Sequence, residues 1–122
     1  MTRPVSPHAI RLSRAYDPPG PDDGTRVLAD RLWPRGVSKA ALAIDRWPRE
    51  IAPSDELRRW LHADPARWPD FGRRYRAELE SHAGELTALR SIARQGTLTL
   101  VFAAKDIDHN NAVVLRDVLL SV

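Results

Sequence analysis

The stretch TLTLVFAA, residues 97–104, is the strongest strand signal in the chain, and it decides the fold. Leu98, Leu100 and Phe102 would face one side of this strand, because successive side chains of a strand point to opposite sides. Val101 makes the other side apolar as well. A strand that is apolar on both sides is typical of the centre of a parallel sheet that is covered by helices. We therefore expect residues 97–104 to form the central strand.

Weaker patterns predict the remaining elements. Further extended segments are expected at Ile10–Tyr16, at Arg26–Ala29 and at Ile44–Trp47. Capping residues and apolar spacing predict five helices: Lys39–Ala43 after Ser38, one after Ser54, one after Asp64-Pro65, Glu85–Arg94 beyond a break at Gly84, and Asn110–Leu120. Strands at both ends of the chain with helices between them predict a small α/β domain. Its sheet should be at least partly parallel, with three to four strands and with helices on both faces.

One helix carries a regular aromatic pattern. Trp68, Phe71, Tyr75 and Leu79 recur at spacings of three and four residues, which places them on one face of the helix. We expect this face to be buried, and we interpret the tryptophans at positions 47 and 60 as core residues too.

Length and composition describe a single domain spanning residues 1–122, in which residues 1–8 form a loose tail. The sequence shows no membrane span and no signal peptide. It contains no cysteine, which excludes disulfides and thiol chemistry and fits a cytoplasmic protein. The oligomeric state cannot be read from the sequence.

The positive charge of the chain is uneven. Residues 1–61 hold 11 Lys+Arg against 8 Asp+Glu, whereas residues 62–122 hold 8 of each, so the net charge of +3 belongs to the first half. Arginine, which supplies 17 of the 19 cations, suits phosphate and carboxylate groups, although genome composition also produces such a bias. A net charge this low does not by itself make a nonspecific DNA binder.

Polar residues follow each of the principal predicted strands. In open α/β sheets, ligands bind beyond the carboxyl ends of the strands, so these residues are candidates for one shared site. The candidates are Tyr16 and Asp17 after the first strand, Asp30, Arg31, Trp33 and Arg35 in the turn DRLWPRG (residues 30–36), and Lys105, Asp106, Asp108, His109, Asn110 and Asn111 after the last strand. The last helix would add its N-terminal amide groups to Lys105 at an anion site.

The DRLWPRG turn also has a structural interpretation. Arg31 or Arg35 can pair with Asp30 or Asp45 and hold the turn as a clamp, without binding a ligand. Trp33 can serve as a core or lid residue or as a stacking platform.

The cluster after the last strand leaves similar alternatives open. Lys105 and Asp106 can form an ion pair, and His109 can be a solvated cap or a general base. If a reaction occurs, Asp106 or His109 is the candidate proton carrier. Asp106, Asp108 and His109 lack the spacing and further ligands of a metal site, and no cofactor motif such as G-x-G-x-x-G is present. We therefore predict neither a metal nor a cofactor.

Several segments together resemble the YeaO-like family of bacterial proteins, also called domain of unknown function 488. They are YDPP, DGTRVLADRLWPRGVSK, APSDELRRWLHADPARW, FGRRYRAEL, TLTLVFAAKD and HNNAVVL, which span residues 10–120. The resemblance implies a fold but no established activity.

The resemblance also marks individual positions. Its characteristic residues fall on Asp30, Arg31, Trp33, Pro34, Arg35, Gly36, Lys39, Pro53, Ser54, Arg58, Lys105, Asp106 and Asn110. Many members have histidine after that asparagine, where this chain has Asn111. This departure counts against a reaction or a metal site that needs a histidine at that position.

Two functions remain open at this stage. The first is a cytoplasmic protein that binds, and can process, an anionic small molecule that is phosphorylated or nucleotide-like. Its ligand-binding residues would be Tyr16, Asp30, Arg31, Trp33, Arg35, Lys39, Lys105 and Asn110. The alternative is a regulatory or interaction domain that contacts nucleic acid or a protein partner through its basic first half.

Overall fold

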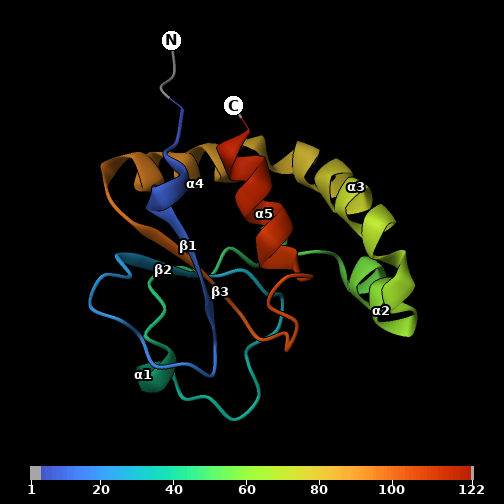
Figure 1. Cartoon of the computed structure of the whole chain (residues 1–122), viewed down its shortest axis with the longest axis horizontal. Coiled ribbons are helices and arrows are strands. Elements are labelled where there is room, and N and C mark those ends of the chain that lie inside the picture. Colours follow the sequence, from blue (N-terminus) through green and yellow to red (C-terminus); the bar gives the residue numbers. More distant parts are fainter. Residues whose placement is uncertain (1–3, 122) are drawn as a thin grey trace.

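A three-stranded parallel sheet forms the centre of the molecule (Figure 1). The structure, a computed structural model, describes residues 4–121. The strand order is β1 (Ile10–Arg14), β3 (Leu98–Phe102) and β2 (Thr25–Leu28), with β3 parallel to both neighbours. All five residues of β3 are buried. The predicted central strand and the α/β class are therefore confirmed.

Each face of the sheet packs against its own apolar cluster. On one face, Leu98, Leu100 and Phe102 join the main core together with buried residues of α2, α3, α4 and α5. On the other face, Val101 and Leu28 pack with Leu42 of α1 and with the loops around it. Helices thus cover both faces, but the second face receives only one short helix.

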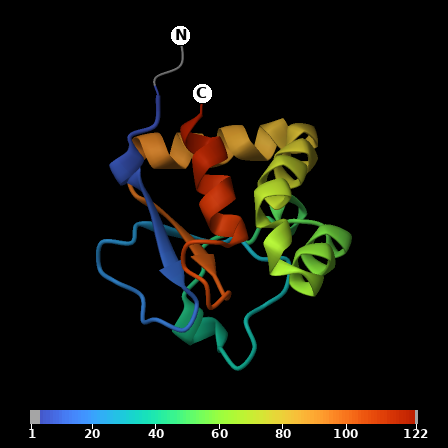
Figure 2. The same cartoon turned by 45° about the vertical axis from the view of Figure 1, so that its right-hand side comes forward.

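The helices α1 and α2 begin directly after their predicted caps, Ser38 and Ser54. The helices are α1 (Lys39–Leu42), α2 (Asp55–Ala63), α3 (Trp68–Leu79), α4 (Ala83–Gln95) and α5 (Asn111–Leu120), with 3-10 turns at Pro7–Ala9, Arg49–Ile51, Pro65–Arg67 and Glu80–His82 (Figure 2). The side chains of Ser38, Ser54 and Asn110 each accept a hydrogen bond from a backbone N–H in the first turn of the following helix. No helix within residues 4–121 is long and apolar enough to cross a membrane.

The extended segment predicted at Ile44–Trp47 is not a strand. It forms a single bridge, between Arg46 and Val27, and the sheet keeps three strands. The ring N–H of Trp47 donates to the backbone oxygen of Asp30 at 2.7 Å, and Pro48 has no N–H to continue a ladder. The segment therefore leaves the sheet after one bridge.

Two helix boundaries differ from the predicted ones. Asp64 caps a 3-10 turn, Pro65–Arg67, and α3 begins only at Trp68. Gly84 lies inside α4, because the chain between α3 and α4 turns at Glu80–His82 instead. A lone glycine is tolerated in a helix that is held by tertiary packing.

The aromatic face of α3 is confirmed as part of the core, with one exception. Phe71, Tyr75 and Leu79 are each at most 1% exposed, whereas Trp68 is only partly buried. The hydroxyl of Tyr75 donates to the backbone oxygen of Ile51 at 2.6 Å, so α3 also fixes the segment that precedes α2. The tryptophans at positions 33, 47 and 60 are partly buried as well, at the margins of the two clusters.

The connection from β1 to β2 is anchored by a buried ion pair. Asp23 and Arg26 are 5% and 4% exposed, and their charged groups are 2.5 Å apart. Burial alone would raise the pKa of Asp23, but hydrogen bonds from Gly20 and Arg26 and the nearby arginine charges lower it overall. At Gly24, which has φ +62, an added Cβ would lie 2.2 Å from the backbone oxygen of Thr97, so only glycine fits.

The segment predicted to be a loose tail packs on the domain where the structure describes it. Residues 1–3 lie outside the described residues. Val5 is 4% exposed and belongs to the main core. The guanidinium of Arg116 donates to the backbone oxygens of Pro7 and Ile10, at 2.9 Å and 3.0 Å.

Replacing Phe71 with alanine should lower the free energy of unfolding by about 3–5 kcal/mol. The change removes a fully buried ring and leaves a cavity that the neighbouring side chains cannot fill. Phe71 is 1% exposed and stacks on Trp68, with ring centroids 5.5 Å apart. Urea unfolding followed by tryptophan fluorescence measures the change. Ile107→Ala is the control, because Ile107 is 60% exposed. A loss below about 1 kcal/mol for Phe71→Ala would mean that α3 contributes little to the core.

Candidate functional site

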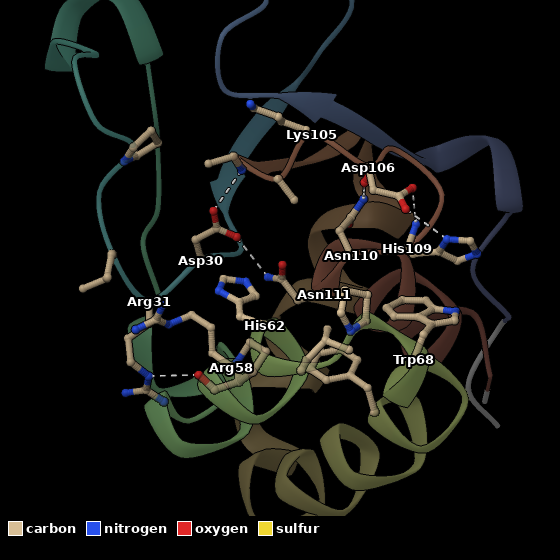
Figure 3. A pocket seen from close by; sticks show the side chains of 18 of the residues that line it. Asp30, Arg31, Arg58, His62, Trp68, Lys105, Asp106, His109, Asn110 and Asn111 are labelled. Carbon is tan, nitrogen blue, oxygen red and sulfur yellow. Dashed lines mark hydrogen bonds and ion pairs between the residues drawn. The ribbon is translucent and has the colours of Figure 1, made fainter.

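A pocket of about 690 Å³ opens beyond the carboxyl ends of β2 and β3 (Figure 3). Its walls come from the turn after β2, from the chain after β3, and from α2, the start of α3 and the start of α5. The lining residues are Asp30, Arg31, Leu32, Trp33, Pro34, Arg35, Pro53, Arg58, Leu61, His62, Pro65, Trp68, Phe71, Ala103, Ala104, Lys105, Asp106, His109, Asn110 and Asn111. Two of the three predicted strand-end clusters therefore share one cavity.

The carboxylate of Asp30 joins three elements at the base of this pocket. It accepts hydrogen bonds from the backbone N–H of Ala103 at 2.9 Å and from the side-chain amide of Asn111 at 3.0 Å. The same amide donates to the backbone oxygen of Ala29 at 2.8 Å. Burial raises the pKa of Asp30, although these hydrogen bonds and the charge of Arg58 partly oppose the increase.

Arg31 is held by the backbone rather than by an acid. Its guanidinium donates to the backbone oxygens of Ala52 and Pro53, both at 3.1 Å. These contacts fix the chain that leads into α2. The alternative in which Arg31 pairs with Asp30 or Asp45 is not what the structure shows, but Arg31 does clamp the turn.

Trp33 forms a wall of the pocket. Its ring N–H donates to the backbone oxygen of Val37 at 2.6 Å, and its ring meets that of Trp47 edge to face, with centroids 5.4 Å apart. It packs against the smaller apolar cluster while it also lines the pocket. Trp33 is therefore a rigid residue shared by the core and the site.

Three cations other than Arg31 line the pocket. Arg35 and Lys105 are exposed, and among residues 4–121 neither has an acidic partner within ion-pair distance. The alternative in which Lys105 pairs with Asp106 is therefore not what the described residues show. Arg58 lies 3.4 Å from Asp55, and its Nε atom is buried without a hydrogen-bond partner among the described residues.

Asp106 and His109 form a pair at the rim of the pocket. One carboxylate oxygen of Asp106 accepts from the backbone N–H groups of Asp108 and His109, and the other lies 3.0 Å from the His109 ring. The hydrogen bond from Asp108, followed by those from His109, lowers the pKa of Asp106. The His109 ring also lies against Trp68, with centroids 5.0 Å apart. Asp106 is thus a carboxylate at neutral pH and an acceptor for the imidazole.

Asn110 has a structural task in addition to lining the pocket. It is 3% exposed, its side-chain oxygen caps α5 through the N–H of Val113 at 3.2 Å, and its amide donates to the backbone oxygen of Asp106 at 2.9 Å. Both ends of its side chain are therefore engaged within the protein.

Two predicted ligand-binding residues lie outside this pocket. Tyr16 is 50% exposed, and its hydroxyl donates to the backbone oxygen of Arg35 at 3.2 Å. It does not line the cavity, because β1 is the strand on the far side of β3 from β2. Lys39 lines a second hollow nearby.

Other pocket residues were not predicted from patterns in the sequence. No sequence pattern points to His62, the helical spacing of Trp68 predicts a core position, and Arg58 is marked only by the family resemblance. Arg58 and His62 lie four residues apart, and this spacing places both side chains on the same face of α2. That spacing was the available signal, but it does not tell which face of α2 turns toward the strand ends.

The described residues contain no group of three or more histidine, aspartate or glutamate side chains that could hold a metal ion. The polar groups of the pocket can instead offer hydrogen-bond donors and positive charge.

The fold and the site define a small α/β protein with an all-parallel sheet and a polar pocket at the carboxyl edge of that sheet. The chain belongs to the DUF488 family, because residues 9–122 match the group described as "Inactive DUF488-N3 subclade".

Its relatives carry no assigned activity in their names. The chain is 45% identical to the uncharacterized protein YeaO of Escherichia coli (strain K12) over 113 residues, which cover 93% of this chain and 98% of that protein. It is 39% identical to the uncharacterized protein Rv3073c of Mycobacterium tuberculosis (strain ATCC 25618 / H37Rv) over 110 residues, which cover 90% of this chain and 92% of that protein. No solved structure matches the chain.

The raised pKa of Asp30 predicts a characteristic pH dependence. The folded protein binds the Asp30 proton more tightly than the unfolded chain, so proton uptake by this group stabilises the fold as the pH falls through its raised pKa toward 3.8. The free energy of unfolding of the wild type, minus that of Asp30→Asn, should therefore increase between pH 7 and pH 4. Asp23 and Asp106, whose pKa values are lowered, cancel in this difference because both proteins contain them.

Urea unfolding of both proteins at a series of pH values measures this difference. A difference that stays constant, or that decreases toward acid pH, would contradict the buried ionisation of Asp30.

Proposed function

We propose that this protein binds an anionic small molecule, phosphorylated or nucleotide-like, in the pocket at the strand ends. One observation carries the proposal. Arg35 and Lys105 follow different strands, lack ion-pair partners in the described chain, and line one cavity whose walls are partly apolar. A cavity with cations at its rim and apolar walls suits an organic anion better than a bare inorganic ion.

The charges of the lining favour an anion. Four lining residues are arginine or lysine, and two are aspartate. Asp30 is engaged with Ala103 and Asn111, and Asp106 is engaged with His109. The remaining positive charges repel one another across the cavity, and a bound anion would relieve this repulsion.

The apolar part of the lining favours a ligand with a ring or another apolar body. Four apolar lining residues come from α2, α3 and the chain between them: Leu61, Pro65, Trp68 and Phe71. Trp33 and Pro34 come from the DRLWPRG turn. Burial of a nucleobase-sized group among these residues would add affinity through removal of apolar surface from water. A nucleotide combines such a group with a phosphate.

Binding without turnover fits the observations better than catalysis does. Asp106 and His109 remain the candidate proton carriers, since the carboxylate can accept a hydrogen bond from the imidazole. However, both side chains are more than half exposed, where water competes for every proton transfer. The group that the chain matches is described as inactive, which also favours a binding role.

Replacing Lys105 or Arg35 with alanine should weaken binding of AMP by about 10–100-fold, because each change removes a charge-assisted hydrogen bond to the phosphate. Isothermal titration calorimetry with AMP, and with inorganic phosphate as the smaller probe, measures the affinities. Because Lys105 and Arg35 make no side-chain hydrogen bond or ion pair within the described residues, we expect both variants to fold normally.

Arg59→Ala is the matched control. Arg59 is an exposed arginine on α2 that does not line the pocket, so its loss changes the net charge equally but should leave the affinity for AMP unchanged. If Arg59→Ala weakens the binding of AMP equally, the loss of affinity reflects the net charge of the protein and not contacts in the pocket. Absence of saturable binding of AMP and phosphate at millimolar concentrations would refute the proposal.

A further inference from the structure

A second hollow, of about 250 Å³, adjoins the pocket and shares Trp33 with it. Its other lining residues are Lys39, Ile44, Asp45, Arg46 and Trp47. Trp33 is therefore the wall between two concave sites. A ligand longer than one nucleotide could pass over this wall and occupy both.

The chain around the second hollow is rich in exposed basic residues. Residues 33–49 contain Arg35, Lys39, Arg46 and Arg49 but only one acidic residue, Asp45. All four cations are exposed, and within residues 4–121 none of them forms an ion pair. The carboxylate of Asp45 accepts a hydrogen bond from the backbone N–H of Arg26 at 2.8 Å, so it helps to hold the fold.

Three arginines of α2 and α3 have acidic partners instead. Arg58 and Arg73 each lie within 3.4 Å of an aspartate three residues earlier on the same helix, and Arg76 lies 3.9 Å from Asp117. Exposed charges in such pairs partly cancel one another. Exposed arginines without an ion pair among the described residues also occur elsewhere, as at Arg59 and Arg74, but residues 33–49 bring four such cations together beside the two hollows.

The two indole rings between and beside the hollows are held in place. The ring N–H of Trp33 donates to the backbone oxygen of Val37, and that of Trp47 donates to the backbone oxygen of Asp30. The guanidinium of Arg49 lies over the Trp47 ring, 3.8 Å from its centroid. A cation–π contact uses the face of the guanidinium, so its N–H groups stay available to a phosphate.

From this arrangement we infer that the ligand is a short stretch of single-stranded nucleic acid. This inference rests on the proposed function: one nucleotide occupies the pocket, and the following nucleotides cross Trp33 into the second hollow. Aromatic rings that can contact bases, combined with cations that follow a phosphate chain, are the features by which proteins bind single strands.

The length dependence of binding tests the inference. Fluorescence anisotropy competition with oligoadenylates, from AMP to the hexanucleotide, should show affinity that increases about tenfold or more and then levels off once both hollows are filled. The logarithm of the binding constant should decrease with the logarithm of the salt concentration, with a slope of about −0.7 for each phosphate that is contacted. This slope should be steeper for the hexanucleotide than for AMP.

A double variant locates the additional contacts. In Lys39→Ala/Arg46→Ala the affinity for the hexanucleotide should fall to that for AMP, because both cations of the second hollow are gone. Neither side chain forms a hydrogen bond or ion pair within the described residues, so the fold should persist, and circular dichroism checks this. Arg59→Ala/Arg73→Ala, on α2 and α3, removes the same charge and should keep the full increase with length.

Three outcomes would overturn the inference. Binding of AMP with no increase for longer oligonucleotides would leave the proposed function intact and remove the second hollow from it. Failure of AMP and of every oligonucleotide to bind would remove both. An equally tight, Lys39- and Arg46-dependent binding of hexaglutamate would show that the basic strip recognises an acidic peptide instead.

Discussion

The hydrogen-bonded carboxylate of Asp30 is the interaction on which the site depends. Parallel strands end side by side, but nothing in the sheet itself fixes the chains that leave those ends. Asp30 supplies this connection, because its oxygens bind the backbone after β3 and the first residue of α5. Burial makes the charged carboxylate costly, as its raised pKa indicates. The buried charge therefore lowers the stability of the fold, while its hydrogen bonds hold three walls of the pocket in fixed positions.

The DRLWPRG turn both clamps the chain and lines the pocket, and its residues divide between the two tasks. Asp30 and Arg31 bind protein groups and shape the pocket from behind. Trp33 forms the wall between two hollows, with its ring N–H tied to the backbone. Among the charged residues of this turn, Arg35 alone is exposed and has no ion-pair partner within the described chain. Asp30 and Arg31 thus act as a clamp, whereas ligand binding by Arg35 remains a proposal.

Several predicted features failed for reasons that are local and physical. Ile44–Trp47 has the apolar pattern of a strand, but the Trp47 ring binds the Asp30 backbone and Pro48 ends any ladder. Gly84 was interpreted as a break, yet packing of α4 against the core outweighs its low helix propensity. The tryptophans at positions 47, 60 and 68 are predicted to lie in the core, but all three are only partly buried, because such large rings are seldom fully buried.

The sequence by itself determined the central strand, the serine caps of α1 and α2 and the edge of the sheet at which polar residues gather. These features depend on the alternation of apolar residues and on side chains that bind their own neighbouring backbone, and both are local. Only the tertiary structure decided that Arg58 and His62 would join the pocket, and that Tyr16 and Lys39 would not line it. Those outcomes depend on which face of α2 turns inward and on β1 and β2 lying on opposite sides of β3. Contacts between distant elements fix both, and no short stretch of sequence encodes them.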